Sequence, residues 1–460
     1  MKKDISTILN ILGRIIIIIG AITFLPVFVA LYFKESPLPF LIPSILSIVL
    51  GLTLIKTTKV YKVKLYHCMA ISSLSWLIAS LIGAIPFLLS IKYFSYVDAV
   101  YESMSAWTTT GMSLIENVEV IDKSIIFWRS LEQWIGGVGI LVLSSLVLSN
   151  LAHYLYLSEA RQEKIMPKFL STVKAIFWIY LLYTIIGILL LYLSGLTFWQ
   201  AINLTMTGIC TGGMSLSNYS FPYNSLAKLS MIFIMFVGGI VSFSVHHKIL
   251  TGKFYLDCQT KYAIFIIFLS SLFIYLHDKI DILDSLFIVT SAMTSTGFST
   301  FDISKLSDPS LILLIFIMFI GGGAGTTTGG VKIIRFLIIL KVAYYEIKKL
   351  ILPKSAVVYE SLGGNKLDNN MIREAFVIFF LYWIIAFISF LIFSFYTKPI
   401  RALFDSVSFI SNIGLSLGVV TINSPIVLKI LGILLMWLGR LEIIPILITL
   451  FIITQNKKHI

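Results

Sequence analysis

Four short segments of this chain place small polar residues before a glycine and continue with a large apolar residue and a serine. The residues of these segments that could bind an ion are Thr109, Thr110 and Gly111; Thr211, Gly212 and Gly213; Ser295, Thr296 and Gly297; and Asn412, Ile413 and Gly414. A second glycine follows each segment glycine after the same 25 residues, at Gly136, Gly238, Gly322 and Gly439. Self-similarity of this kind indicates a repeated structural unit, so we predict four copies of one unit around a central axis.

The chemistry that such segments favour is the binding of a dehydrated cation. A glycine can adopt backbone angles that are closed to other residues, so that successive carbonyl oxygens of a short strand face the same side. Four strands around one axis would form rings of carbonyl oxygens, which can replace the hydration shell of an ion. None of the four segments contains Asp or Glu. This composition favours a monovalent cation, because divalent ions usually need carboxylate ligands.

The elements that position these segments are predicted to be membrane helices. Hydrophobic residues make up 58% of the 460 residues and charged residues 12%, and the mean hydropathy is +0.96. Soluble proteins carry about 25% charged residues. The chain also has many stretches close to the roughly 20 mostly apolar residues that a membrane span needs. The three cysteines, Cys68, Cys210 and Cys258, are scattered and indicate neither a disulfide framework nor a metal site.

The net charge of +13 comes largely from short basic clusters beside the apolar stretches, at residues 2–3, 56–64, 161–174, 341–354 and 457–458. Lys and Arg next to membrane spans mark the cytoplasmic side. Placing all five clusters on that side gives one consistent topology, with both termini in the cytoplasm. The basic residues therefore orient the chain in the membrane and contact membrane lipid, and they do not indicate a nucleic-acid partner.

The predicted fold is an all-α membrane protein with ten transmembrane helices, made of an N-terminal hairpin and four helix–pore-loop–helix repeats with pseudo-fourfold symmetry. The hairpin covers residues 1–66, and the repeats cover residues 67–170, 171–258, 259–368 and 369–460. Each repeat has an outgoing helix, a half-helix too short and polar to cross, a glycine segment and a returning helix. The half-helices are expected to begin near the polar residues 13 positions before each segment glycine, which are Asp98, Gln200, Asp284 and Arg401. The returning helices are predicted over residues 124–150, 226–250, 311–340 and 426–453.

The third returning helix contains a run of glycines and threonines that a continuous helix tolerates poorly. The candidate gating residues in this run are Gly321, Gly322, Gly323, Gly325, Thr326, Thr327, Thr328 and Gly329. We therefore predict a break in this helix. The resulting loop would lie below the glycine segments, where it could obstruct the path and swing aside.

Arg440 is a further candidate gating residue, because it follows the second glycine of the fourth repeat where the other repeats have Gly137, Gly239 and Gly323. The register places its guanidinium beside the path at the height of the loop. An arginine at membrane depth needs a partner or a water-filled cavity, so the loop carbonyls and Glu442 are its candidate partners. The hypothesis is that Arg440 raises the barrier to cations and stabilises the closed loop.

Together these residues resemble the Trk/Ktr/HKT superfamily of potassium transporters, whose chains carry four helix–pore-loop–helix repeats. The resemblance covers nearly the whole chain, and its most specific parts are residues 109–111, 128–130, 133–137, 321–332 and 439–442. The N-terminal hairpin is more similar to the Trk branch (TrkH or TrkG) than to the Ktr branch. The resemblance implies a potassium-selective filter that is narrowest at the four segment glycines, and an intramembrane gating loop at the Gly/Thr run.

The resemblance also carries implications for selectivity. Gly111 favours potassium, because a serine at this position accompanies sodium transport in some plant members of the superfamily. Asn412 and Ile413 depart from the hydroxyl residues of the other segments, so the filter is not expected to be perfectly symmetric. Potassium is the expected bound ion, and no organic cofactor is expected. Whether ion flow is passive or proceeds by symport with sodium or protons stays open.

The resemblance further implies the potassium-translocating subunit of an uptake system in the cytoplasmic membrane of a prokaryote. It implies a homodimer with a pore in each protomer, and a cytoplasmic, nucleotide-binding regulatory subunit of the TrkA type. This chain has no dinucleotide-binding fingerprint of its own, so nucleotide control would come from that partner. The basic segments 161–174 and 341–354 are the expected docking segments.

Other interpretations stay open beside this one. A secondary transporter of a small anionic or amphipathic solute also uses broken helices at the midplane, but it usually has two inverted repeats, whereas this chain has four copies in the same order. An enzyme is not expected, because no constellation of nucleophile, base and metal ligands is present. The second glycines could serve helix packing alone. Glu102 and Asp405, each nine residues before a segment glycine, could tune the field at the path, or cap or bond neighbouring half-helices.

Overall fold

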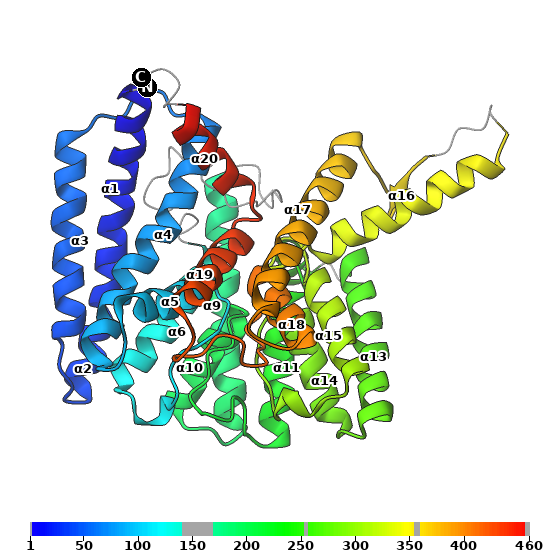
Figure 1. Cartoon of the computed structure of the whole chain (residues 1–460), viewed down its shortest axis with the longest axis horizontal. Coiled ribbons are helices and arrows are strands. Elements are labelled where there is room, and N and C mark those ends of the chain that lie inside the picture. Colours follow the sequence, from blue (N-terminus) through cyan, green and yellow to red (C-terminus); the bar gives the residue numbers. More distant parts are fainter. Residues whose placement is uncertain (1, 140–168, 253–255, 354–358, 456–460) are drawn as a thin grey trace.

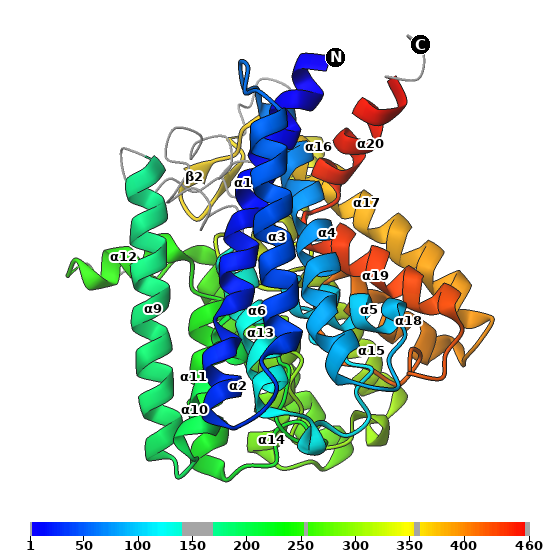
Figure 2. The ribbon, with the colours of Figure 1, turned by 90° about the vertical axis from the view of Figure 1, so that its left-hand side faces the viewer.

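The computed structural model describes residues 2–139, 169–252, 256–353 and 359–455, which form long helices around a group of short ones (Figure 1). The N-terminal hairpin consists of α1 (Lys2–Phe24), extended by α2 (Pro26–Tyr32), and of α3 (Leu38–Thr57). Glycines bring α1 and α3 into close contact, since a Cβ on Gly51 would lie 2.5 Å from the carbonyl oxygen of Gly13. Figure 2 shows both helices beside α4 (Leu65–Ser90), which opens the first repeat.

The four repeats follow the predicted order of elements. The outgoing helices are α4, α9 (Phe169–Leu193), α13 (Cys258–Asp278) and α17 (Asn369–Ser394). The half-helices are α5 (Tyr96–Trp107), α10 (Phe198–Ile209), α14 (Ile282–Met293) and α18 (Pro399–Ile410). The returning segments begin with α6 (Lys123–Val138), α11 (Ser225–Gly239), α15 (Asp308–Ile320) and α19 (Ile426–Arg440). In Figure 1 the half-helices lie in the lower half of the view, whereas both chain ends lie at the top. The residue limits of the repeats as domains stay a prediction.

Each half-helix begins two residues before the polar position that the sequence marks, and local capping explains the start. The Ser95 hydroxyl accepts a hydrogen bond from the Asp98 N–H at 3.3 Å, and the Asp98 carboxylate accepts one from the Ser95 N–H at 2.9 Å. Thr197 and Gln200 form the same reciprocal pair in the second repeat. A capping box of this kind satisfies N–H groups that have no partner within the helix.

The continuous returning helices that we predicted over residues 226–250 and 426–453 are wrong. The chain bends by 106° between α11 and α12 (Phe243–Leu250), and by 107° between α19 and α20 (Ile444–Gln455). At the first bend Ser242 caps a new helix. At the second bend Glu442 and Ile443 adopt φ of 53° and 70°, outside helical conformation.

The break recurs near the second glycine of every repeat. α6 ends at Val138 before Gly139, whose φ is 98°. Residues 140–150 of the predicted first returning helix lie outside the described residues. α15 ends at Ile320, and a new helix, α16 (Ile333–Ile351), starts only at residue 333. The sequence indicated a break in the third repeat alone, because only there does the run of glycines and threonines announce it.

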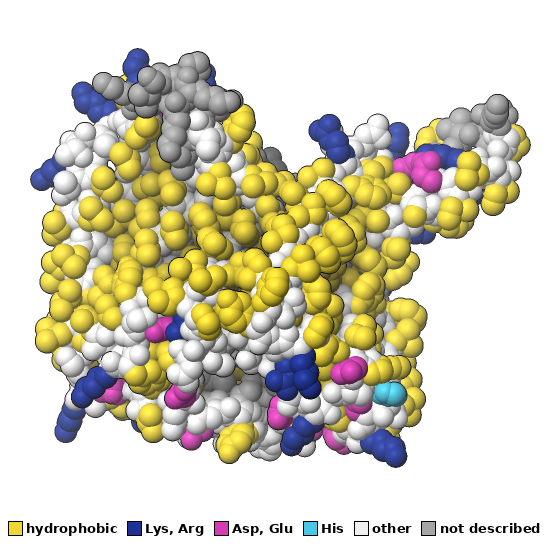
Figure 3. All heavy atoms as spheres, viewed as in Figure 1, with side chains coloured by type: hydrophobic (Ala, Val, Ile, Leu, Met, Phe, Trp, Pro, Cys, Tyr) yellow, Lys and Arg dark blue, Asp and Glu magenta, His cyan; other side chains and the backbone are white. Residues whose placement is uncertain are grey.

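The surface of the molecule is that of an all-α membrane protein. Within the described part of the chain, six helices are long and apolar enough to cross a membrane, or up to eight if each bent pair is one span. Figure 3 shows hydrophobic side chains over the middle of one face and charged side chains toward its lower edge and its upper end. The remaining elements are the short helices η1 (Val118–Val120) and η3 (Ile303–Lys305) and a hairpin of β1 (Ser361–Leu362) and β2 (Asn365–Lys366).

Candidate ion-conduction site

The four half-helices end in the same backbone motif. The first residue of each segment, at Thr109, Thr211, Ser295 and Asn412, has a φ between 51° and 57°. The N–H of the next residue donates to the carbonyl oxygen five residues earlier, as from Thr110 to Ser105 at 2.9 Å and from Ile413 to Ser408 at 3.0 Å. This pattern is a Schellman motif, in which glycine usually takes the left-handed position. Here threonine or serine takes it in three repeats, and such strain concentrates at functional sites.

The segment glycines close a ring. Their φ values are 87°, 65°, 86° and 91°. A Cβ on Gly111, Gly213, Gly297 or Gly414 would lie 2.0, 1.8, 2.1 or 2.2 Å from the carbonyl oxygen of Gly212, Thr296, Ile413 or Thr110, respectively. Each repeat thus contacts the next, and the fourth contacts the first. We call these four glycines and four carbonyl groups the glycine ring. Only glycine fits at the four positions, because real Cβ atoms do not approach another atom within 3.0 Å.

The departure of the fourth segment from the others has a structural explanation. Asn412 occupies the left-handed position, which asparagine tolerates better than β-branched residues do. Its Nδ2 donates to the Thr110 hydroxyl and to the Met436 carbonyl oxygen, both at 2.9 Å. Asn412 therefore ties the fourth repeat to the first, while its neighbour Ile413 supplies a ring carbonyl as the other segments do.

The second glycines pack against the ends of the half-helices. A Cβ on Gly136, Gly238 or Gly439 would lie 2.0, 2.4 or 2.0 Å from the carbonyl oxygen of Trp107, Ile209 or Ile410. In the third repeat a Cβ on Gly322 would instead meet the Gly239 carbonyl oxygen at 2.4 Å. The constant spacing of 25 residues therefore reflects close backbone packing, which was the simpler of the two readings for these glycines.

Glu102 and Asp405 bond within their own repeats, to the strand that follows the segment glycine. The Glu102 carboxylate accepts hydrogen bonds from the Ser113 hydroxyl and the Leu114 N–H, each at 2.9 Å, and forms a buried ion pair with Arg129 at 3.0 Å. The Asp405 carboxylate accepts from Ser416, Leu417 and Val419 at 2.7–3.0 Å. Both side chains thus hold the ascending strands of the first and fourth repeats in place.

The predicted break in the third returning helix is present as a loop of residues 321–332, which we call the Gly/Thr loop. All eight candidate gating residues between Gly321 and Gly329 lie in it. Thr327 contacts the second repeat, since its hydroxyl lies 3.2 Å from the Thr211 hydroxyl and donates to the Gly238 carbonyl oxygen at 3.1 Å. A Cβ on Gly329 would lie 2.2 Å from the Ser411 carbonyl oxygen. The loop therefore lies directly against the ends of two half-helices.

Arg440 joins the Gly/Thr loop to the first repeat. Its Nη1 donates to the Thr327 carbonyl oxygen at 2.9 Å and to the Thr109 hydroxyl at 3.2 Å, and its Nη2 donates to the Gly136 carbonyl oxygen. The guanidinium also lies over the Trp76 ring, 5.1 Å from its centroid. Of the two candidate partners that the sequence suggested, the loop carbonyl is in contact with Arg440.

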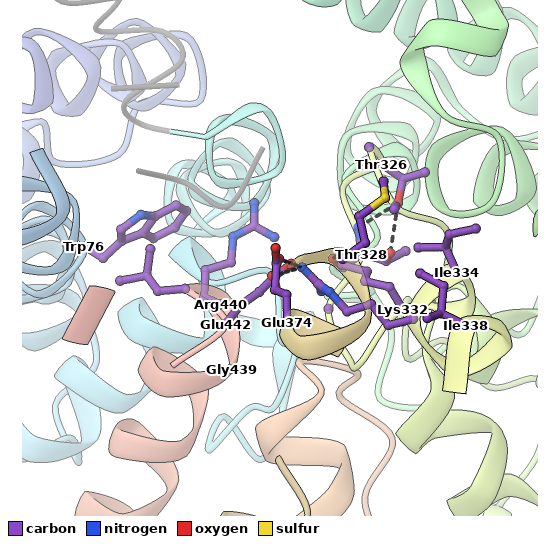
Figure 4. Close-up of a pocket in the computed structure, with 16 residues that line it drawn as sticks. Trp76, Thr326, Thr328, Lys332, Ile334, Ile338, Glu374, Gly439, Arg440 and Glu442 are labelled. Carbon is purple, nitrogen blue, oxygen red and sulfur yellow. Dashed lines mark hydrogen bonds and ion pairs between the residues drawn. The ribbon is translucent and has the colours of Figure 1, made fainter. Parts of the chain in front are cut away.

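Glu442, the other candidate, instead forms an ion pair with Arg335 of α16 at 2.7 Å, and Arg335 also contacts Glu374 of α17 at 3.3 Å. These residues line a pocket of about 390 Å³ on the loop side of the ring. In Figure 4 Trp76 and Arg440 lie on one side of this pocket, and Thr326, Thr328 and Lys332 lie on the other. Lys332 donates to the Thr328 carbonyl oxygen within the loop. Sequence reasoning missed this charge cluster, because its members are far apart in the chain and share no spacing.

The fold and the closed ring define a multi-pass membrane protein of the transporter class, and comparison with known proteins agrees. A family model described as TrkH, cation transport protein, matches residues 39–264 and 258–459. An uncharacterized cation transporter of Methanocaldococcus jannaschii is 62% identical over 97% of this chain and 95% of its own length. The Trk system potassium uptake protein TrkH of Salmonella typhimurium is 30% identical over 82% of this chain and 83% of its own.

The structural comparison points the same way. The crystal structure of the potassium transporter TrkH from Vibrio parahaemolyticus matches with a TM-score of 0.86 and 27% identity, covering 96% of this chain and 98% of that one. The chain therefore belongs to the TrkH family of cation transport proteins, which confirms the predicted resemblance to the Trk branch.

Proposed function

We propose that this protein conducts potassium ions across the membrane through the glycine ring. The observation that carries the proposal is the closure of the ring, in which the four segments alternate glycine and carbonyl oxygen around one axis. The same four segments contain no carboxylate, which suits a monovalent ion. The names of the relatives in Salmonella and Vibrio, which are potassium uptake proteins, support potassium as the ion.

The Gly/Thr loop is the proposed gate, with Arg440 holding it closed. The loop lies against the ends of two half-helices through Thr327 and Gly329. Arg440 donates both to this loop and to the ring segment at Thr109, so that release of one guanidinium would free the loop from the first repeat. The glycines of the loop supply the backbone freedom that such a movement needs.

The membrane topology and the partners belong to the same proposal. The protein would lie in the cytoplasmic membrane of a prokaryote as a homodimer, with both termini in the cytoplasm. A cytoplasmic, nucleotide-binding subunit of the TrkA type would control the gate. Support comes from α16, which directly follows the loop, carries Lys341, Lys348 and Lys349 and projects beyond the helical body in Figure 1. The other expected docking segment lies mostly outside the described residues.

The test is the flux of potassium and of sodium into liposomes that contain the purified protein, beside the variant Gly111→Ser and protein-free liposomes. A Cβ at Gly111 would lie 2.0 Å from the Gly212 carbonyl oxygen, so the variant is expected to lose potassium flux or to admit sodium. Absence of cation flux from the wild-type protein, even with the regulatory subunit added, would favour the solute-transporter alternative.

A further inference from the structure

One position of the glycine ring differs chemically among the four repeats. The residue before the segment glycine is β-branched in three repeats, as Thr110, Thr296 and Ile413, and is Gly212 in the second repeat. β-Branched side chains restrict their own backbone, whereas glycine leaves it free. The consecutive glycines Gly212 and Gly213 would therefore be the most mobile part of the ring if nothing else held them.

The side chain of Gln133, from α6 of the first repeat, occupies the space where a side chain on Gly212 would lie. A Cβ on Gly212 would lie between 2.5 and 2.7 Å from the three terminal atoms of the Gln133 amide. Gln133 is fully buried and stands three residues before the second glycine of its repeat. The equivalent residues of the second and fourth repeats are Met235 and Met436, which have no amide to offer.

Gln133 also bonds to the ring on both sides of Gly213. Its Nε2 donates to the Gly212 carbonyl oxygen at 2.7 Å, and its Oε1 accepts from the Met214 N–H at 3.2 Å. The orientation of the amide is determined by these partners, because a carbonyl only accepts and an N–H only donates. The Gly212 carbonyl is the one that faces Gly111 across the ring. In the described part of the chain, no side chain donates to the carbonyls of Thr110, Thr296 or Ile413.

We propose that Gln133 is a positioning residue for ion selection, which holds the carbonyl of Gly212 in the ring in place of the missing β-branched side chain. The inference rests on the proposed function of the ring. One lone pair of the Gly212 carbonyl oxygen is engaged by the amide, and the other stays available to an ion. A ring that selects among ions by its geometry requires all four carbonyls to be held equally well. Gln133 supplies this restraint to the second repeat from outside the segment.

The experiment compares the ratio of potassium to sodium flux in liposomes for the wild-type protein and for Gln133→Met. Methionine keeps the length of the side chain and reproduces the residue of the second and fourth repeats, but it removes both hydrogen bonds. The ratio is expected to fall about tenfold, in line with the loss of two buried hydrogen bonds. Thermal unfolding is measured in parallel. Altered stability with an unchanged flux ratio would show that Gln133 is merely structural and would overturn the proposal.

A rescue variant and a control sharpen the test. Gln133→Ala combined with Gly212→Thr restores a β-branched residue where space has been made, and the negative φ of Gly212 suits threonine. This double variant is expected to recover the ratio that Gln133→Ala alone loses, and failure to recover it would count against the proposal. Ser130→Ala, which removes a buried hydroxyl bonded only within α6, is expected to leave the ratio unchanged. A wild-type protein that does not prefer potassium would refute the proposed function itself, whereas a preference that Gln133→Met retains refutes this inference alone.

Discussion

The two sides of the glycine ring obey different symmetries. On the half-helix side the four repeats are nearly identical, with the same Schellman motif and with left-handed φ values within a few degrees of each other. On the other side all four returning segments break near their second glycine, but each continues differently. The third repeat inserts the Gly/Thr loop, and the fourth inserts Arg440, which reaches across to the first repeat.

This difference separates two requirements of an ion pathway. Selection among ions needs equal ligands around the ion, and equal ligands follow from repeated backbone geometry. Obstruction of the path needs only one element that can take two positions, so a single repeat suffices for it. The strain of the ring segments recurs in every repeat, whereas the contacts of the loop depend on one arginine and one threonine.

The largest effect is expected for Gly213→Ala, which breaks the symmetric side. Its Cβ would lie 1.8 Å from the Thr296 carbonyl oxygen, on a backbone with a φ of 65°. Potassium flux in liposomes is expected to fall by at least about a hundredfold, because a strained φ alone contributes about 1–3 kcal/mol and the collision adds to it.

Gly418→Ala is the matched control for this variant. Gly418 also has a positive φ, 81°, but a Cβ there would meet no atom within 4 Å, so most of the flux should remain. Equal losses in both variants would mean that backbone strain, and not the closeness of the ring, explains the result.

A smaller effect is expected on the asymmetric side, for Arg440→Ala. Removal of the donors to Thr327 and Thr109 is expected to raise basal ion flux about tenfold, because hydrogen bonds from a charged group contribute roughly 1.5–3 kcal/mol. Arg440→Lys keeps the charge but not the forked donor geometry, and thus separates electrostatic repulsion from the holding of the loop. Unchanged flux and gating in Arg440→Ala would remove Arg440 from the proposed mechanism.

The smallest effect is expected for Asn412→Ala, where the symmetric side is linked between two repeats. The variant loses two hydrogen bonds of 2.9 Å and the tolerance of asparagine for left-handed backbone. The free energy of unfolding in detergent is expected to decrease by about 1–2 kcal/mol. Ser295→Ala is the control, because the Ser295 hydroxyl has no partner among the described residues. A decrease in Ser295→Ala as large as that in Asn412→Ala would contradict the role of the amide.

Much of the fold could be predicted because each repeat carries the same local signals. The half-helix starts follow from Asp98 and Gln200, whose capping boxes involve residues only three positions apart. The break in the third returning helix followed from its glycines. The bends after Gly239 and Arg440 were missed, because neither carries a comparable run of helix-breaking residues and packing around the ring imposes the change of direction.

The sequence by itself determined the four repeats, the glycine positions and the apolar helices, because spacing, backbone freedom and hydropathy are properties of neighbouring residues. The partners of the long polar side chains were decided only by the tertiary structure. Gln133 reaches Gly212, Asn412 reaches Thr110 and Arg440 reaches Thr327. These contacts join different repeats, and a hydrogen bond between distant segments leaves no periodic trace in either of them.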